Sequence, residues 1–398
     1  MTRPYDVLIV GGGPAGASLA LHLVRCDGIE PSRIVVIDAA RFPRDKPCAG
    51  AISSWGLRAL GAVGVSLRSL GVASVPMRGL RVLHGGAFGA TEAELGALVR
   101  RTSFDAALLR EAANAGVEVR EASGLVSLAR EGDVFRASTA TGALSARYVA
   151  ACDGAGSRTR KLLGLREPAR KGHLYVTDTP STTSDVGALA HLCDFDLDVT
   201  GAGVEGYYWD FPTPAPDAGG QWVNRGIYHA NMTPRSDVKA VLSRSLTARG
   251  LDPEKVVLRP FPTRPFVPET VLAHEGIVFV GEAAGIDRTT GEGIAQAIVM
   301  AEIAARTLAR ALRVGRHAIE AYPESVRTSR VGRHLLQSAW LAARVYGASG
   351  ARYRTLLRDS PSARRAGAAW YAGERLPRLT KAALAVSLGV EGLRAAFV

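Results

Sequence analysis

Apolar runs that end in glycine-rich turns occur three times along this chain. Residues 6–10 form the first run, the turn follows at 11–16, and apolar positions with a helical period come next. A short apolar run bounded by glycine predicts a buried strand, and the period after it predicts a helix. The same order of strand, turn and helix is predicted over 148–164 and over 276–305. Strands that alternate with helices in this way indicate a parallel sheet.

The first turn has the glycine spacing of a dinucleotide phosphate site. Gly11 permits a tight turn, Gly13 lets the backbone approach a pyrophosphate, and Gly16 lets helix and strand pack closely. The N-terminus of the following helix offers unpaired N–H groups to the phosphate charge. A second apolar run, 34–37, ends in Asp38, about 20 residues on, where such sites place an acid on a ribose 2′-OH. This context makes an ordinary glycine-rich turn the weaker alternative.

The other two turns also carry residues suited to a ligand. The second turn holds Asp153 and Gly154, with Ser157 at the start of the predicted helix. The third turn holds Gly281 and precedes a long helix predicted to open near Gly293. Three such turns spread over one chain predict that a single extended ligand is contacted three times.

The order of these turns resembles that of FAD-dependent oxidoreductases of the p-hydroxybenzoate hydroxylase type, and within them the geranylgeranyl reductase family. Three further segments carry the resemblance. FPRDKPCAGAIS, over 42–53, is similar to the family's KPCGG segment, with Cys48 in register and Ala49 in place of a glycine. GYYWDFP, over 206–212, matches the signature YxWxFP, and RRTSFD, over 100–105, matches R-x-x-F-D. Five motifs in the family's order are more specific than any one of them.

The resemblance covers about residues 5 to 310 and implies that the extended ligand is FAD. By analogy with the family, Glu282 becomes the contact to the ribityl chain, and Gly291 and Gly293 lie under the flavin ring. Two positions depart from the family pattern. Glu282 stands where the family has Asp, and Arg288 stands where it has Pro, which predicts a cation near the flavin.

The resemblance also assigns the remaining cofactor contacts. Arg101 is expected to hold the phosphate or ribityl side of the flavin, and Asp105 to begin a helix. Cys48 is expected near the flavin, where it orients substrate or assists proton delivery; the alternative is an inert, small apolar residue. The residues expected to bind FAD are Gly11, Gly13, Pro14, Ala15, Gly16, Asp38, Ala49, Gly50, Arg101, Asp153, Gly154, Gly281, Glu282, Gly291, Gly293 and Ile294.

The substrate side is predicted from an alternation of aromatic residues. Tyr207, Trp209 and Phe211 alternate with Tyr208 and Asp210, so the first three share one face of a strand. Together with Cys48, these three are the candidate residues for positioning a substrate near the flavin. The face then lines an apolar tunnel. The alternative is that the aromatic side chains form sheet core.

The predicted fold class is α/β: a Rossmann-like FAD-binding domain with an inserted antiparallel or mixed β-sheet substrate domain, followed by C-terminal helices. A chain of 398 residues exceeds the roughly 250–300 residues that one core supports. The FAD-binding domain is expected to be discontinuous over 1–75, 98–170 and 270–330, the substrate domain to comprise 76–97 and 171–269, and the helical region 331–398.

The last segment carries one apolar helical stripe, formed by Leu379, Ala383, Val386, Val390, Leu393 and Phe397. One interpretation is packing against the substrate domain or a second subunit. The other is contact with a membrane surface, for which Arg375, Arg378 and Lys381 are suitably placed.

Composition narrows the classes of partner. The net charge is +12, but the arginines are scattered and no nucleic-acid-binding module is visible, so nucleic acid is excluded. The charge favours anionic lipid headgroups, a diphosphate or an acidic carrier, unless it reflects only an arginine-rich solvated surface. The four cysteines have no CxxC spacing, so neither a metal site nor a disulfide framework is predicted. No signal peptide or membrane span is visible, which predicts a cytoplasmic protein or one peripheral to a membrane.

The resemblance implies reduction of carbon–carbon double bonds in a prenyl or similar apolar substrate. The main alternative is a flavin-dependent monooxygenase, an epoxidase or hydroxylase, acting on a natural-product scaffold. Halogenation is less favoured because no lysine occurs between Lys46 and Lys161 and the halogenase signature WxWxIP is absent. A flavin or lipid carrier without catalysis is disfavoured by three intact flavin contacts. NAD(P)H or a protein electron donor is expected as reductant; the oligomeric state is left open.

Overall fold

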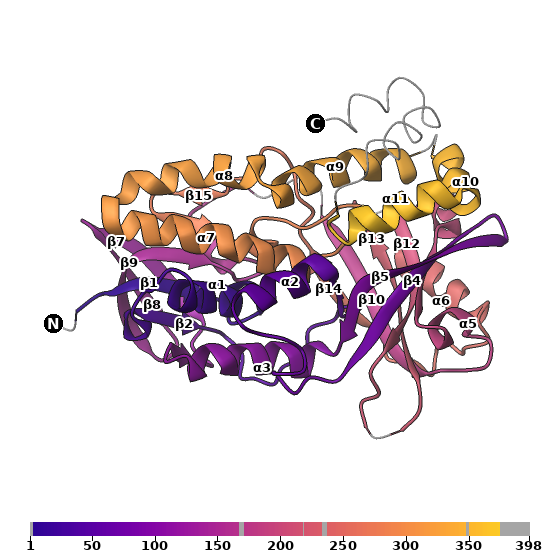
Figure 1. Ribbon diagram of the computed structural model, residues 1–398, viewed down its shortest axis with the longest axis horizontal. Coiled ribbons are helices and arrows are strands. Elements are labelled where there is room, and N and C mark those ends of the chain that lie inside the picture. The colour runs from indigo at the N-terminus through magenta and orange to yellow at the C-terminus, as the bar shows by residue number, and fades with distance from the viewer. Residues whose placement is uncertain (1–2, 167–170, 218, 233–236, 348–349, 375–398) are drawn as a thin grey trace.

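The computed structural model describes residues 3–166, 171–217, 219–232, 237–347 and 350–374. Figure 1 shows two β-sheets side by side, with helices along one side of both. The fold class expected from the sequence is confirmed, since one sheet is largely parallel and the other is largely antiparallel.

The first sheet positions the three glycine turns. Its strand order is β15-β16-β9-β1-β2-β6, and the β7–β8 hairpin extends it beyond β9. The strands are β1 (Tyr5–Val10), β2 (Ile34–Ile37), β6 (Glu118–Arg120), β7 (Leu125–Glu131), β8 (Val134–Thr139), β9 (Gly142–Ala151), β15 (Ala273–His274) and β16 (Ile277–Phe279). Because β1, β2, β9 and β16 run parallel, their carboxyl ends share one edge. The loops after these strands therefore meet at that edge, as ligand sites of open α/β sheets require.

Helices from distant parts of the chain cover the first sheet. They are α1 (Pro14–Arg25), α2 (Ser54–Ala62), α3 (Arg101–Asn114), α4 (Arg158–Leu162) and α7 (Ile294–Val314). Helix α1 contacts both α3 and α7. The expectation that Asp105 begins a helix is wrong, because α3 begins at Arg101 after the extended Arg100. Arg101 and Asp105 thus lie one helical turn apart on the same face, which allows them to pair.

The second sheet has the order β14-β10-β13-β12-β11-β4-β5-β3. Its strands are β3 (Ala51–Ser53), β4 (Ser74–His84), β5 (Ala87–Val99), β10 (Gly172–Pro180), β11 (Leu192–Asp196), β12 (Gly206–Thr213), β13 (Trp222–His229) and β14 (Arg259–Thr263). All neighbours pair antiparallel except β11 and β4. Strand β3 pairs with β5 in this second sheet, although its residues lie within the segment 1–75 that was expected to belong to the FAD-binding domain.

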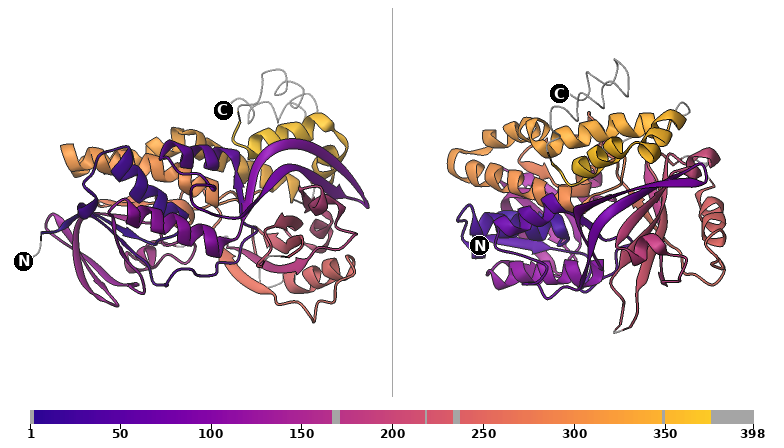
Figure 2. Two further views of the ribbon diagram at one scale, coloured as in Figure 1. Left: turned by 60° about the horizontal axis from the view of Figure 1, so that its bottom comes forward. Right: turned by 45° about the vertical axis from the view of Figure 1, so that its right-hand side comes forward.

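Shorter helices and the last helices lie at the second sheet: α5 (Val186–Leu189), α6 (Val238–Thr247), α10 (Ala351–Asp359) and α11 (Pro361–Tyr371). Helix α8 (Tyr322–Thr328) packs on α7 over the first sheet, and α9 (Arg330–Val345) reaches the cores of both sheets. Helices α10 and α11 pack on the β4–β5 hairpin, as both views in Figure 2 show. The apolar stripe predicted at 379–397 lies outside the described residues.

Alternate side chains of β12 pack into two separate apolar cores, one on each face of the strand. Tyr207, Trp209 and Phe211 pack in one apolar cluster with residues of α9 and α11. Tyr208 belongs to a separate cluster with residues of α6. The prediction that the three alternating aromatic residues share a face is confirmed.

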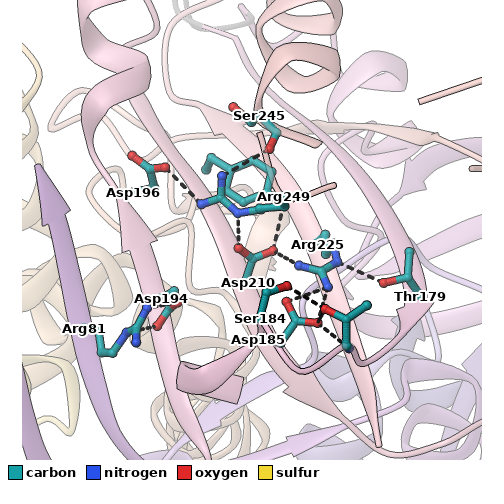
Figure 3. Close-up of polar contacts among 12 residues, drawn as sticks. Arg81, Thr179, Ser184, Asp185, Asp194, Asp196, Asp210, Arg225, Ser245 and Arg249 are labelled. Atoms are coloured by element: carbon teal, nitrogen blue, oxygen red, sulfur yellow. Dashed lines mark hydrogen bonds and ion pairs between the residues drawn. The ribbon is translucent and has the colours of Figure 1, made fainter. Parts of the chain in front are cut away.

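The opposite face of β12 carries buried charge (Figure 3). Asp210 accepts a hydrogen bond of 2.6 Å from Arg225 Nη1 and also pairs with Arg249. On the neighbouring strand, Asp194 pairs with Arg81 at 2.8 Å. Arginine suits this position because its planar fork satisfies several acceptors at once, which limits the cost of burying carboxylates.

Candidate active site

One cavity of about 550 Å³ lies where the carboxyl edge of the first sheet meets the second sheet. All three glycine turns reach it. So do β10 and β14 of the second sheet, through Leu174, Phe261 and Thr263. One space therefore contacts both sheets, as an extended ligand held by three turns requires.

Most of the residues expected to bind FAD line this cavity: Gly11, Gly13, Pro14, Ala15, Asp38, Arg101, Asp153, Gly154, Glu282, Gly291, Gly293 and Ile294. Cys48 lines it as well. The remaining predicted residues are not part of the lining formed by the described residues: Gly16, Ala49, Gly50, Gly281, Tyr207, Trp209 and Phe211. Sequence reasoning missed several lining residues: Arg44, Lys46, Ser123, Gly124, Leu125, Arg158, Leu174, Phe261 and Thr263.

The three glycines of the first turn are needed for different physical reasons. Gly11 has a φ of 107°, and a Cβ there would lie 2.4 Å from the Cys152 carbonyl oxygen. A Cβ on Gly16 would lie 1.9 Å from the Gly11 carbonyl oxygen, so both positions are required by the fold. Gly13 has an ordinary φ of −71°, and its Cβ would meet only the tip of the Arg44 side chain, at 3.3 Å. The protein itself does not require glycine at position 13, whereas a pyrophosphate held against the backbone would.

Asp38 is oriented by backbone groups at the end of β2. Its Oδ2 accepts a hydrogen bond from the Gly12 N–H at 2.7 Å, and its Oδ1 accepts one from the Ala40 N–H at 2.8 Å. The carboxylate is thereby fixed at the cavity wall beside the glycine turn, in the place predicted for a ribose contact.

A cationic group lies next to the glycine turn. Arg101 donates two hydrogen bonds to Asp105, of 2.7 and 2.6 Å, and Arg44 pairs with the same carboxylate at 3.0 Å. Burial alone would lower the pKa of Arg101, but the Asp105 charge and the Cys48 thiol outweigh it and raise that pKa. Two guanidinium groups thus share one carboxylate, and the tip of Arg44 reaches Gly13, so the excess positive charge favours an anionic ligand.

Two carboxylates border the cavity at the second and third turns. Glu282 forms a 2.8 Å ion pair with Lys46. Asp153 accepts two hydrogen bonds of 2.8 Å from Thr159 through Oδ2, while its Oδ1 is buried without a hydrogen-bond partner among the described residues. Because buried polar atoms are normally satisfied, the free oxygen indicates a missing ligand or water at this wall. Together with the open space at Gly13, it shows that the residues present fit FAD.

The loop over 287–293 is fixed by tyrosine hydroxyl groups. Tyr207 of β12 donates to the Thr290 carbonyl, Tyr346, which caps the C-terminus of α9, donates to the Thr289 carbonyl, and Tyr228 of β13 donates to the Arg288 carbonyl. These three contacts attach the second sheet and a C-terminal helix to the loop that the resemblance places under the flavin ring. We call the three side chains the tyrosine collar.

Arg288 does not present its guanidinium group to the cavity. Its Nη2 lies 3.3 Å from Glu205, and the residue is absent from the cavity lining formed by the described residues. The guanidinium group of Arg288 is thus directed to Glu205 rather than to the cavity, and its nearness to the flavin stays a prediction.

The aromatic face of β12 adjoins the loop over 287–293 but not the cavity itself. Tyr207, Trp209 and Phe211 are all less than 6% exposed, and Phe195 contacts the first and third at 5.0 Å between ring centres. Trp209 donates a hydrogen bond of 2.8 Å to Asn224, which in turn donates to the Cys48 carbonyl at 3.2 Å. The indole is thus connected to the KPC segment at the cavity wall.

Comparison with known proteins identifies the class. A family model described as an FAD-binding domain matches residues 4–195. The chain is an FAD-dependent oxidoreductase, in agreement with the cavity described above.

Within the described residues, no helix has the length and hydropathy needed to cross a bilayer.

Two relatives cover most of the chain. A digeranylgeranylglycerophospholipid reductase of Methanocella arvoryzae is 26% identical over 335 residues, which span 79% of this chain and 80% of the relative. A solved geranylgeranyl bacteriochlorophyll reductase-like protein of Thermoplasma acidophilum is similar over 99% of this chain and 96% of its own, with a TM-score of 0.75 and 20% identity. Over most of its length the protein is therefore similar to proteins named as reductases of geranylgeranyl compounds.

A shorter match lies outside that group. A rifampicin monooxygenase of Streptomyces venezuelae is 31% identical over 175 residues, which span 41% of this chain and 35% of the relative. This similarity is confined to less than half of either protein.

Proposed function

We propose that this protein saturates carbon–carbon double bonds in a prenyl chain or a similar apolar lipid. The observation that carries the proposal is the cavity shared by the two sheets, whose wall on the second sheet and beside the third turn is apolar at Leu174, Phe261 and Ile286. An isolated alkene offers no polar handle, so it is bound by shape and apolar contact. The reductase names of the long relatives support the same substrate class.

The chain's own residues have distinct tasks in this reaction. Arg44 and Arg101 hold the anionic middle of the cofactor, Asp38 takes the ribose, and Glu282 takes the ribityl chain. When bound, FAD supplies two-electron redox chemistry. The tyrosine collar fixes the loop under the ring, and the packed aromatic face of β12 supports that loop from the side of the second sheet. NAD(P)H or a protein donor serves as reductant.

A membrane surface is the natural source of such a substrate. The net charge of +12 favours a peripheral contact with anionic headgroups, which would let an apolar chain pass from the bilayer to the protein. Within this proposal the enzyme binds the membrane reversibly rather than spanning it.

The decisive experiment incubates the reduced holoenzyme without oxygen with prenyl diphosphates, prenyl quinones and a lipid extract. Mass spectrometry should show the gain of one hydrogen pair for each double bond reduced. The second candidate function, oxygenation, is favoured by the match to the rifampicin monooxygenase. It predicts gain of oxygen in air and no anaerobic product, which would refute the reductase.

A further inference from the structure

A second cavity, of about 690 Å³, lies at β6, the edge strand of the first sheet. It is bounded by the loop after β2, by α3 and by the carboxyl end of β6. Its lining shares no residue with the lining of the FAD cavity, and no step of the reaction proposed above uses it. The volume falls within the roughly 300–1,000 Å³ that is typical of small-molecule sites. We call this cavity the arginine groove.

The floor of the arginine groove is apolar and is built largely from small side chains. Ala106, Leu109 and Ala113 follow one another at spacings of three and four residues, so they share one face of α3. Val119 of β6 and the ring of Phe42 complete the floor. The two alanine residues leave room over the helix, which suits a planar ring laid against it.

Three arginine side chains surround this floor. Arg120 is already engaged, because it bonds to Glu118 at 2.6 Å and to the Tyr5 hydroxyl group at 3.1 Å. Arg41 and Arg110 are exposed, and neither side chain has a hydrogen bond or an ion pair with any described residue. Two uncompensated guanidinium groups at one apolar floor favour a phosphate, whose oxygen atoms match the planar fork of arginine.

One carboxylate also lines the groove. Glu121 is held at the wall because its Oε1 accepts a hydrogen bond of 3.2 Å from the Phe42 N–H. Its negative charge disfavours a ligand that is anionic throughout, but its oxygen atoms can accept hydrogen bonds from an amino group. Adenine combines a planar ring with such an amino group. An adenosine phosphate therefore matches the apolar floor, the acceptor and the two cations together.

The arginine groove and the FAD cavity have common walls. Phe42 lines the groove, and the Arg44 guanidinium group, 4.7 Å from the centre of that ring, lines the FAD cavity. Leu109 also lines the groove, and its side chain would lie 2.9 Å from a Cβ on Gly12 in the first turn. A ligand in the groove is therefore a neighbour of the turn proposed to hold the FAD pyrophosphate.

We propose that the arginine groove binds a phosphorylated adenosine, with the base on the α3 floor and the phosphate between Arg41 and Arg110. The adenosine of FAD itself does not take this place, because Asp38, its expected ribose contact, lines the other cavity. Two sources share the chemistry. One is the adenosine end of NADPH, which gives a hydride to the flavin and leaves as NADP⁺; the other is a free adenine nucleotide such as ATP. The inference goes beyond the proposed function and does not depend on alkene reduction.

The test uses the FAD-loaded enzyme, so that the FAD site is already filled. Calorimetric titrations with NADPH, ATP, inorganic phosphate and a prenyl diphosphate should show binding of NADPH or ATP. Arg110→Gln should raise the dissociation constant of that nucleotide about 10- to 100-fold, which is the effect of losing a charge-assisted hydrogen bond. Arg68→Gln, an exposed arginine outside both cavities, is the matched control and should bind as wild type does.

A second variant distinguishes a nucleotide site from a simple phosphate site. Ala113 is exposed on α3, so Ala113→Leu should fold normally while its longer side chain fills the floor of the groove. Nucleotide affinity should fall in this variant, whereas any affinity for inorganic phosphate should be unchanged. If NADPH is the ligand, its apparent dissociation constant in anaerobic flavin reduction should rise in both variants, with reduction by dithionite unaffected. If ATP is the ligand, it should bind without reducing the flavin.

Absence of binding by both nucleotides would overturn the proposal. Equal nucleotide affinities in wild type, Arg110→Gln and Ala113→Leu would overturn it as well. Tighter binding of the prenyl diphosphate than of either nucleotide would assign the groove to another ligand and have the same effect. None of these results touches alkene reduction, which is tested separately by the anaerobic product analysis.

Discussion

The contrast between Gly13 and Gly16 tests the cofactor site most directly. Gly13→Val should leave the apoprotein nearly as stable as wild type, because the added Cβ meets only the flexible tip of Arg44, at 3.3 Å, and lies at the wall of an open cavity. Replacing the helix N-cap glycine costs about 1 kcal/mol of unfolding free energy at most. The same side chain occupies the space where the pyrophosphate approaches the backbone, so FAD should bind much more weakly.

The loss of affinity can be bounded. Moving the pyrophosphate away from the helix N-terminus removes at least one charge-assisted hydrogen bond, about 1.5–3 kcal/mol. That corresponds to a dissociation constant larger by roughly 10- to 150-fold. Gly16→Ala should show the reverse pattern, because its Cβ would lie 1.9 Å from a backbone oxygen and something must shift. Its apoprotein should lose about 1–3 kcal/mol of stability or more.

The assay is a flavin titration of each apoprotein, paired with urea unfolding of the same preparation. Wild-type affinity in Gly13→Val would refute the placement of the pyrophosphate at this turn. Loss of apoprotein stability equal to that of Gly16→Ala would show that Gly13 is required by the fold rather than by the ligand.

Three further predictions concern other parts of the molecule. Arg101→Ala should weaken FAD binding by about 1.5–3 kcal/mol in a flavin titration, and unchanged affinity would remove Arg101 from the cofactor contacts. Trp209→Ala should lower the unfolding free energy by about 3–5 kcal/mol; if the aromatic face also positions substrate, single-turnover reoxidation should slow about 100-fold with FAD retained, whereas normal reoxidation would assign Trp209 to the core alone. Burial raises the pKa of Asp194 to about 7 despite Arg81. Between about pH 4 and 7 the folded protein therefore holds a proton that the unfolded chain has released, so the free energy of unfolding should decrease as the pH rises from about 4 to 7. Urea unfolding across that range should show a smaller slope for Asp194→Asn, and an identical slope would contradict the assignment.

The glycine turns and the strands before them could be predicted because their signals are local. An apolar run, a glycine spacing and an acid such as Asp38 all occur within a few tens of residues, and parallel pairing then brings the turns to one edge. The alternation along β12 was equally readable, since a strand has a period of two.

Contacts between distant segments left no such signal. Nothing near residues 51–53 indicates that they pair with β5, because register in an antiparallel pair depends on the partner. Arg44 was missed although it lies beside the recognised KPC segment, since only the folded loop brings it to Gly13. The position of Arg288 could not be inferred either, because its partner Glu205 lies 83 residues away in the chain.

The tyrosine collar has a consequence for how mutations in this enzyme should be interpreted. Its hydroxyl groups come from β12, β13 and the C-terminus of α9, yet all three bond to the carbonyl groups of Arg288, Thr289 and Thr290. The backbone of the loop proposed to lie under the flavin is therefore set by the packing of the second sheet and of the segment that ends α9. A substitution made in the second sheet can therefore change the flavin's spectrum and potential, and a loosened C-terminal helix can resemble a cofactor defect.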